Sequence, residues 1–271
     1  MPEGDTVWLA ARRLHAALAG RPLTRWDLRT PRLSTTDLVG SQVHGVSSYG
    51  KHLLFRIDGG ITLHTHFRMD GSWHLYRPGR PWKGGPEWQV RAVLANEEWQ
   101  AVGYRLPVVE LLRTDDEARV VGHLGPDLLD DNWGRDHAER ARNRLVADPD
   151  RALGEALLDQ RVVAGLGLIY VSEALFLSGI APDTPVRDVT DPDALLERSR
   201  RLLRANRERG AQASTGDLAG QHYVYGRAGR ACRRCGTTIR RGRQGHGITE
   251  RDAFWCPHCQ PTVISGRTPD D

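Results

Sequence analysis

Four cysteines near the end of the chain constrain its fold more than any other feature. They form two Cys-x2-Cys pairs, Cys232/Cys235 and Cys256/Cys259, with 20 residues between the pairs. This spacing brings four thiolates to one tetrahedral zinc ion and leaves a hairpin between them. Two vicinal disulfides or a redox pair would use the same residues, but neither suits a cytoplasmic protein with no other cysteine. The sequence therefore predicts one zinc ion, which is structural because four thiolates leave no coordination position open.

Basic residues gather around these cysteines. The chain has 271 residues and a formal net charge of +4, but residues 198–251 contain 14 arginines and only three acids. This local excess of positive charge indicates a surface that binds polyanions, and a solvated basic face is the alternative. Arginines that flank the cysteines, as in "CRRCG", would present cations to a phosphate backbone.

Lysine is rare in this chain, which limits the amines available for chemistry. Only Lys51 and Lys83 are lysines among the 38 basic residues. A guanidinium group does not deprotonate under ordinary conditions, so arginine cannot replace a reactive amine. The candidates are therefore these two side chains and the N-terminus, where Pro2 follows the initiator and precedes Glu3.

Length and composition indicate a globular protein. A chain of 271 residues with 39% hydrophobic residues suits one large domain or two to three small ones. Charges or glycines interrupt every apolar stretch before 18 residues, and the N-terminus lacks the basic head and apolar run of a signal peptide. We expect a cytoplasmic monomer that makes no membrane contact and needs no small-molecule cofactor.

The apolar pattern predicts a β-rich part followed by a helical part. Asp5 or Thr6 can cap a first helix that Gly20 ends. Short strands separated by Pro and Gly clusters follow and predict a β-sandwich or barrel. The predicted strands are 51–57, 61–66, 71–76, 88–94, 101–104 and 108–112, and the predicted helices after "HLGPDLLDD" are 151–160, 168–178 and 193–208.

Three separated motifs together resemble the formamidopyrimidine-DNA glycosylase and endonuclease VIII family of base-excision repair enzymes. They are the N-terminal Met-Pro-Glu, "LLDQRVVAGLGLIYVSEALFLSGIAP" at 157–182, and the four-cysteine finger. The second motif is similar to the family's helix–two-turn–helix. The opening "MPEG", which has no Leu at position 4, is more similar to the bacterial endonuclease VIII branch. The resemblance extends from Pro2 to about Gln260.

The resemblance implies an α+β multidomain fold. It places an N-terminal helix and β-sandwich in a catalytic domain, followed by a helix–two-turn–helix domain that binds DNA and a zinc-finger hairpin. The expected boundaries are 1–123, 124–217 and 218–261, with a disordered tail at 262–271.

The resemblance also implies a bifunctional DNA glycosylase and AP lyase that acts on damaged double-stranded DNA. The family uses the N-terminal proline as its nucleophile, so the amine of Pro2 would attack the sugar C1′ after removal of Met1. An α-amine has a reference pKa near 8, against about 10.4 for lysine, so far more of it is unprotonated at neutral pH. Glu3 is the matching acid. The resulting iminium would permit β,δ-elimination of the 3′ and then the 5′ phosphate.

Further contacts to DNA follow from the same resemblance. Lys51 would contact phosphate and assist β-elimination, with Lys83 as a bystander, and Arg251 would grip the phosphates that flank the lesion and assist δ-elimination. A base must leave the stack before its sugar can be reached. The strand–turn "HFRMDGSW" would fill the hole: His66 would touch phosphate, and Arg68, Met69 and Asp70 would enter the stack. Taken alone, Met69-Asp70-Gly71 predicts only a hairpin turn.

Four positions depart from the family pattern. Thr6 stands where the family usually has Glu, His123 where the endonuclease VIII branch tends to have Arg, and Arg68 where that branch tends to have Gln. Leu168 replaces an Asn that contacts phosphate, and an apolar side chain cannot donate that hydrogen bond. Either DNA binding is weaker, or backbone amides hold the phosphate while Leu168 packs against neighbours.

Three other functions are compatible with these motifs. A non-catalytic relative that only recognises lesions would explain Leu168. A structural nucleic-acid-binding protein, such as a ribosome-associated helix–two-turn–helix module, would not need Pro2 and Glu3. A purine-selective 8-oxoguanine glycosylase would have a longer loop over the flipped base than the short segment 215–223. That short segment and "MPEG" favour oxidised pyrimidines.

Overall fold

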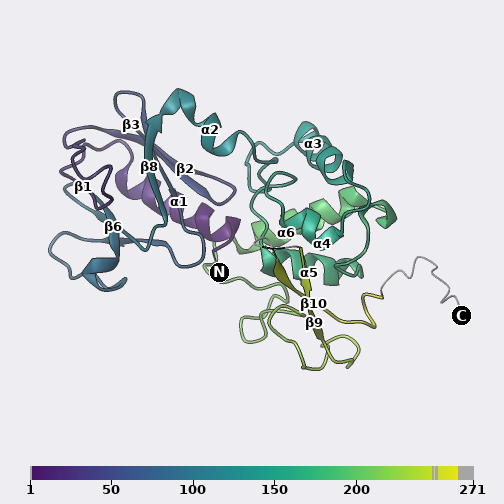
Figure 1. Cartoon of the computed structure of the whole chain (residues 1–271). Helices are drawn as coiled ribbons and strands as arrows, with labels where there is room; N and C mark the ends of the chain where they lie inside the picture. Colours follow the sequence, from purple (N-terminus) through teal and green to yellow (C-terminus); the bar gives the residue numbers. More distant parts are fainter. Residues whose placement is uncertain (1, 246, 248–249, 262–271) are drawn as a thin grey trace, which may run out of the picture. The chain divides into compact units, whose positions relative to one another are not determined.

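A computed structural model describes residues 2–245, 247 and 250–261, and the predicted tail at 262–271 lies outside these residues (Figure 1). The chain divides into two compact units, residues 1–123 and 124–271. No helix among the described residues is long and apolar enough to cross a bilayer.

The first helix begins earlier than its predicted caps. Helix α1 spans Gly4–Leu18, and Glu3 occupies the N-cap position with an extended backbone. The expectation that Asp5 or Thr6 caps the helix is wrong, because the backbone carbonyl of Glu3 already accepts the amide of Val7 at 3.1 Å. Asp5 therefore lies in the first turn, where its charge complements the helix dipole.

Two antiparallel four-stranded sheets form the rest of the first unit, as the sequence predicted (Figure 1). A β-sandwich results because one apolar cluster joins the inward faces of both sheets and the buried side of α1. One sheet has the order β1-β6-β7-β5, made of Arg25–Leu28, Val90–Ala95, Gln100–Tyr104 and Ser72–Tyr76; the other has the order β2-β3-β4-β8, made of Val43–Tyr49, His52–Ile57, Ile61–His66 and Val108–Arg113.

Alternation along the strands assigns each side chain to a face. On β3, Leu53, Phe55 and Ile57 belong to the core, as does Leu63 on β4. The alternate residues, which include His52 on β3 and His64 on β4, therefore project from the opposite face of the sheet. Strand β4 pairs with β3 on one side and with β8 on the other, and the sheet that contains them is the scaffold for the polar residues described below (Figure 1).

Two strands, β1 and β2, lack a sequence signature. Strand β2 contains Gly45 at a register shift, and β1 has only four residues, so neither has a long alternating apolar pattern. Trp88 was expected in a strand but lies in the 3-10 helix η1 (Glu87–Gln89) and is 74% exposed, since β6 begins only at Val90. The connection to the second unit contains η2 (Thr114–Asp116) and α2 (Ala118–Val121).

The second unit is helical and ends in a hairpin. The predicted helix at 168–178 is confirmed as α5, whereas the one at 151–160 is shorter because Asp159 accepts hydrogen bonds from Arg151 and Arg161 instead of continuing the helix. Helix α3 was not predicted, since only two of its residues are buried. The elements are α3 (Arg135–Val146), α4 (Leu153–Leu158), α5 (Leu168–Ser178), η3 (Val186–Asp188), α6 (Pro192–Asn206), β9 (Arg240–Gln244) and β10 (Arg251–Trp255).

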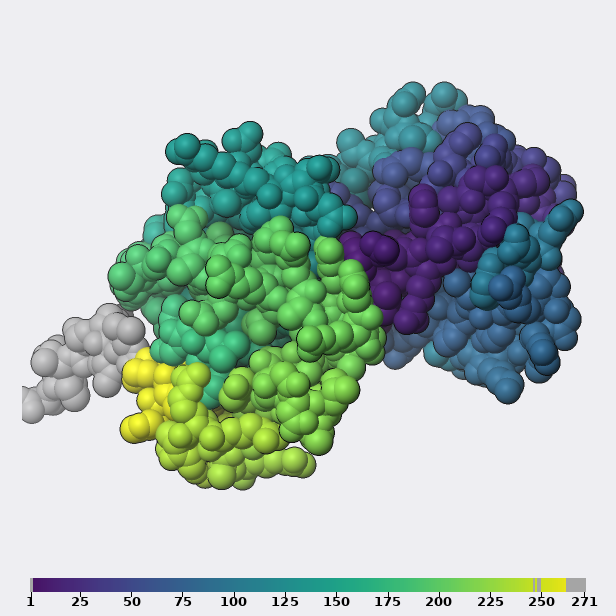
Figure 2. Space-filling model, turned by 180° about the vertical axis from the view of Figure 1, so that it is seen from behind, coloured from purple at the N-terminus to yellow at the C-terminus, as the bar shows by residue number. Residues whose placement is uncertain are grey.

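The hairpin packs directly against the helices. Strands β9 and β10 pair from Arg240↔Trp255 to Gln244↔Arg251. In Figure 2 the yellow-green hairpin residues lie against the green helical segments of the same unit. One apolar cluster holds them together, and its buried members are Leu168, Phe176, Val224, Cys232, Ile239, Phe254 and Cys256.

Candidate nucleic-acid and metal sites

Pro2 and Glu3 lie at the start of α1. The helix is anchored by its apolar face, since Val7 and Leu14 are almost fully buried in the sandwich core. This anchoring fixes the position of the two residues before the helix. The Glu3 side chain is fully buried, and Pro2 is partly exposed. Pro2 and the carboxyl group of Glu3 are thus neighbours on an ordered element, and removal of Met1 would turn the Pro2 nitrogen into a secondary amine.

Lys51 lies in the tight turn between β2 and β3. Tyr49 and His52 are the last paired residues, so Gly50 and Lys51 form a two-residue loop. Gly50 has φ 56°, which a glycine at the first loop position of a hairpin adopts without strain. The turn therefore holds the ammonium group of Lys51 at one end of the sheet β2-β3-β4-β8.

The turn after β4 is closely braced. The amide of Arg68, whose φ is 47°, donates to His66 Nδ1 at 2.9 Å, and the amide of Gly71 donates to the carbonyl of Phe67 at 2.9 Å. A Cβ at position 71 would lie 2.7 Å from that carbonyl oxygen, so glycine is required there.

A second arginine holds the tip of this turn. Arg105, also at φ 47°, donates from Nε to the carbonyl of Asp70 at 3.0 Å. Met69, which lies between Arg68 and Asp70 in this turn, is 58% exposed. A rigid turn thus presents an apolar side chain to solvent, as insertion into a base stack requires.

Three histidines meet beside Lys51 and Arg68. His52, His64 and His66, which we call the histidine cluster, stack or contact edge-on with ring centroids 4.7–5.0 Å apart. Burial and the neighbouring positive groups lower the pKa of His52 to about 3 and that of His66 to about 4. His123 contributes to the lowering of the His52 pKa, so this position, where the endonuclease VIII branch tends to have Arg, lies near the cluster.

His52 and His64 were not among the predicted site residues. The available sequence signal for a site was the presence of three histidines, at 52, 64 and 66, on two consecutive predicted strands, "KHLLF" and "ITLHTH". Their meeting depends on the pairing His52↔His66, which a sequence does not specify.

Leu168, expected at a phosphate contact, begins α5 after the N-cap Gly167. Its side chain is only 7% exposed and belongs to the apolar cluster between α5 and the hairpin, with Phe176 and Phe254. This burial favours the packing alternative, because a side chain enclosed by apolar groups is unavailable to a phosphate.

We therefore expect Leu168→Asn to destabilise the protein without tightening DNA binding. Replacing a buried leucine by an amide loses apolar burial and leaves polar atoms to be satisfied, at a cost of about 3 kcal/mol. Thermal unfolding and affinity for lesion duplex are the measurements, with Leu168→Met as the volume-matched control. Tighter binding at an unchanged melting temperature would contradict this expectation.

Arg251 is the exposed first residue of β10, as its proposed phosphate contact requires. Two other finger arginines already have acidic partners. Arg241 and Arg243 both donate to Asp252, at 2.9–3.0 Å, and Arg243 also pairs with Glu250. Since exposed pairs are weak, phosphates could displace these partners, but the cationic surface is smaller than the arginine count suggests.

The four cysteines form one cluster. Their sulfur atoms all lie within 4.8 Å of one another, with Cys232–Cys259 at 4.0 Å and Cys235–Cys256 at 3.5 Å. A tetrahedral zinc with bonds of about 2.3 Å requires sulfurs about 3.8 Å apart, so the donors fit this metal. Burial raises the pKa of Cys259 to about 12, so this group is a neutral thiol at neutral pH unless a bound cation displaces its proton.

Glu173 fixes the segment that leads into the finger. This fully buried carboxylate on α5 accepts the backbone amides of Tyr223, Val224 and Tyr225 at 2.8–2.9 Å, and the hydroxyl of Ser214. Sequence reasoning missed it, although one charge inside the apolar run "LIYVSEALF" was a usable signal.

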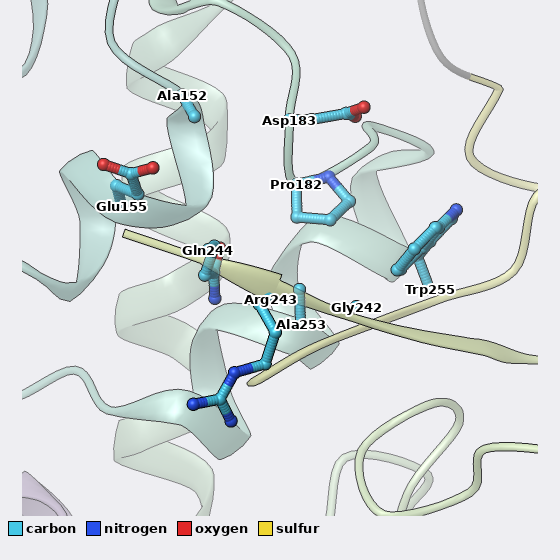
Figure 3. A pocket seen from close by; sticks show the side chains of 9 residues that line it. All are labelled: Ala152, Glu155, Pro182, Asp183, Gly242, Arg243, Gln244, Ala253 and Trp255. Atoms are coloured by element: carbon cyan, nitrogen blue, oxygen red, sulfur yellow. The ribbon is translucent and has the colours of Figure 1, made fainter. Parts of the chain in front are cut away.

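A pocket of about 160 Å³ lies where the hairpin meets α4 (Figure 3). Glu155 lines it and accepts the amide of Gly245 at 2.8 Å, while Gln244 donates to the carbonyl of Asp252. Asp183 adds a second carboxylate. Arg243 also lines the pocket, but it is paired with Asp252 and Glu250. The hydrogen bond from Gly245 to Glu155 joins the end of β9 to α4, so the pocket marks an attachment of the hairpin to the helices.

The chain matches known families over most of its length. Residues 1–106 match the formamidopyrimidine-DNA glycosylase N-terminal domain, and residues 124–215 match the formamidopyrimidine-DNA glycosylase H2TH domain.

Curated relatives cover nearly the whole chain. A "Probable endonuclease 8 2" of Streptomyces coelicolor is 56% identical, over 96% of this chain and 94% of its own length. The "DNA-(apurinic or apyrimidinic site) lyase Nei2" of Mycolicibacterium smegmatis is 44% identical, over 96% and 99%. Among solved structures, the Lactococcus lactis formamidopyrimidine-DNA glycosylase bound to AP-site DNA superposes with a TM-score of 0.79 at 25% identity, covering 96% of this chain and all of that one.

Proposed function

Because the chain belongs to the formamidopyrimidine-DNA glycosylase family, in its endonuclease VIII branch, we propose that it is a bifunctional DNA glycosylase and AP lyase of base-excision repair. The observation that supports this most is the position of Pro2 and Glu3 at the start of helix α1, one face of which is buried. The sequence of a relative named as an AP lyase aligns with 96% of this chain. Damaged double-stranded DNA is the partner.

The proposed nucleophile is the amine of Pro2, freed by removal of Met1. It attacks the sugar C1′, the C1′–base bond breaks, and a protein–sugar iminium forms. Glu3 supplies the proton to the opening sugar or leaving base, and its complete burial suits a carboxyl group that works as an acid. The iminium then acidifies the adjacent sugar carbon, so that β- and δ-elimination release both phosphates.

Lys51 and Arg251 are the proposed phosphate ligands that assist the two eliminations, and His66, Arg68 and His123 are further phosphate or stack contacts. Met69 and Asp70 occupy the braced turn and would fill the space left by the everted base. Leu168 is proposed to serve this site only through packing, since it is buried.

A structural zinc on Cys232, Cys235, Cys256 and Cys259 is part of the proposal. When bound, the ion supplies no chemistry, because four thiolates fill its coordination sphere. The hairpin then holds Arg251 in place, because β10 runs from Arg251 directly to the second cysteine pair.

Oxidised pyrimidines are the proposed substrates. The segment 215–223 is short, and its hydroxyl and carboxylate groups are used internally: Thr215 donates to the carbonyl of Gly220, and Asp217 accepts the amide of Ala219. Such a compact loop is too short to enclose a flipped purine. Selectivity for oxidised purines is the second candidate for the substrate. We also propose that the protein acts at the nucleoid in the bacterial cytoplasm, where its DNA substrate lies.

Borohydride trapping tests the proposal. Protein with Met1 removed, verified by intact mass, should form a covalent adduct with abasic-site DNA, and a lesion panel should show release of oxidised pyrimidines before 8-oxoguanine. A lesion-binding protein without catalysis would bind the same DNA and give no adduct.

A further inference from the structure

The segment between α6 and the finger forms a closed loop, which we call the loop 214–222. The amide of Ser214 donates to the carbonyl of Gln221 at 2.8 Å, so the two ends of the loop meet. Within it, the hydroxyl of Thr215 donates to the carbonyl of Gly220 at 2.8 Å. These hydrogen bonds give the loop a defined shape of its own.

The helical part of the second unit holds the base of this loop. Glu173 on α5, which is fully buried, accepts the hydroxyl of Ser214 at the start of the loop. It also accepts the amide of Tyr223, the residue after the end of the loop, at 2.8 Å. One buried carboxylate thus ties both ends of the loop to a helix. Leu218, near the tip, is 62% exposed, so the helices do not enclose the tip.

The first cysteine pair holds the other side of the loop. Arg233 lies between Cys232 and Cys235, and its Nε donates to the carbonyl of His222 at 3.3 Å. Its guanidinium group also covers Gly220, because a Cβ added at this glycine would lie 2.8–3.0 Å from Nη2, Nη1 and Cζ. Arg233 therefore reaches from the cysteine pair to the loop, and the absence of a side chain at position 220 leaves room for it.

The backbone that carries Arg233 is itself well fixed. The amide of Gly236 donates to the carbonyl of Cys232 at 2.9 Å, and the amide of Arg234 donates to the Cys232 Sγ at 3.4 Å. The guanidinium group of Arg234 lies over the ring of Phe176 on α5, 4.5 Å from its centroid. A long side chain that starts from this braced turn is suited to hold a neighbouring loop in place.

We propose that Arg233 is a positioning residue for the choice of substrate, because it holds the loop 214–222 in the shape that selects the damaged base. The proposal rests on the proposed function, in which the shortness of this segment favours oxidised pyrimidines. It gives the finger a part in base selection in addition to its grip on phosphates. Excision of a base depends on the loop, whereas an abasic site offers no base to select, so the two reactions should respond differently when the loop is displaced.

Single-turnover kinetics on three duplexes test this role, with an oxidised pyrimidine, 8-oxoguanine or an abasic site. Arg233→Ala should slow excision of the pyrimidine about ten-fold, since misplacement of positioning groups costs up to about 100-fold. Its preference for the pyrimidine over 8-oxoguanine should fall, while cleavage at the abasic site stays near the wild-type rate. Equal slowing of all three reactions would overturn the proposal.

A lysine at this position separates positioning from phosphate binding. Arg233→Lys keeps the positive charge but lacks the planar guanidinium group that covers Gly220, so it should show the same loss as the alanine variant. Recovery of pyrimidine excision by the lysine variant would mean that Arg233 acts only as a cation for DNA, and the proposal would be wrong.

Gly220→Ala disturbs the same contact from the side of the loop. The backbone of Gly220 lies outside the left-handed region, so alanine is tolerated there, but its Cβ would displace the Arg233 guanidinium. This variant should also slow pyrimidine excision, and the double variant with Arg233→Ala should be no slower than Arg233→Ala alone. Additive losses would reject the contact. Gly134→Ala is the control, because its Cβ would meet only the Asn132 carbonyl oxygen, at 3.8 Å.

Hydrogen exchange of the peptide that covers 214–222 measures the loop directly. Exchange should be faster in Arg233→Ala than in the wild type, with one zinc per chain in both. Unchanged exchange would show that Arg233 does not hold the loop, and faster exchange with unchanged substrate preference would reject its role in selection. A wild-type protein that excises no base and forms no iminium would instead reject the proposed function, while the exchange data would still report on the contact.

Discussion

Pro2→Gly will reduce the AP-lyase rate by at least about 100-fold, and retention of Met1 will abolish it. Glycine leaves a primary amine without the ring that orients the nucleophile, and an uncleaved methionine removes the reacting nitrogen altogether. The measurement is single-turnover cleavage of abasic duplex, with the N-terminus of each preparation verified by mass.

The two lysines provide the controls for this experiment. Lys83→Ala should be neutral, because Lys83 lies in the loop before η1 and donates to the Tyr76 hydroxyl from its backbone amide, which alanine keeps. Lys51→Ala should slow β-elimination without preventing iminium formation. Full activity in protein that retains Met1 on every molecule would mean that Pro2 is not the nucleophile.

Zinc removal is expected to abolish specific DNA binding. Zinc binding to such sites is worth about 10–16 kcal/mol, as much as the whole stability of a typical domain. Cys232 and Cys256 belong to the apolar cluster that also contains Phe176 of α5, so loss of the metal disturbs the helical unit as well as the hairpin. Cys256→Ser should lower affinity for lesion duplex at least about 100-fold, and metal analysis of the wild type should find one zinc per chain.

His258→Ala is the matched control for the cysteine variant. His258 lies in the second Cys-x2-Cys pair and is exposed, so it can be removed without touching the sulfur cluster. Zinc content and DNA affinity should both be unchanged. Normal binding by a zinc-free preparation would remove the finger from the recognition surface.

Features set by short stretches of chain were predictable from the sequence. The cysteine pairs meet because each knuckle is local and a single hairpin joins them. Helix α5 was predicted with its bounds, since an apolar run ends at Gly179, whose φ is 71°. The turn at 67–71 follows from Gly71, which alone tolerates the close approach of the Phe67 carbonyl.

Capping and helix length were harder to predict because they depend on competition between nearby groups. Asp5 has a good capping side chain, yet the helix starts before it, since the amide of Val7 already donates to the carbonyl of Glu3. The predicted helix ending at Gln160 stops at Leu158, where Asp159 binds arginines instead.

The sequence by itself determined the family, the β-rich first part, the four-cysteine cluster and the candidate nucleophile, because each depends on residue identity within one segment or on the order of segments. Only the tertiary structure decided that Leu168 is enclosed by the hairpin, that Glu173 binds the backbone amides of the segment before the finger, and that His52, His64 and Glu110 lie in one hydrogen-bonded line. Each of these contacts joins residues from separate elements. Their meeting is set by strand register and by the packing of apolar faces, which minimise free energy over the whole fold and leave no mark in the local sequence.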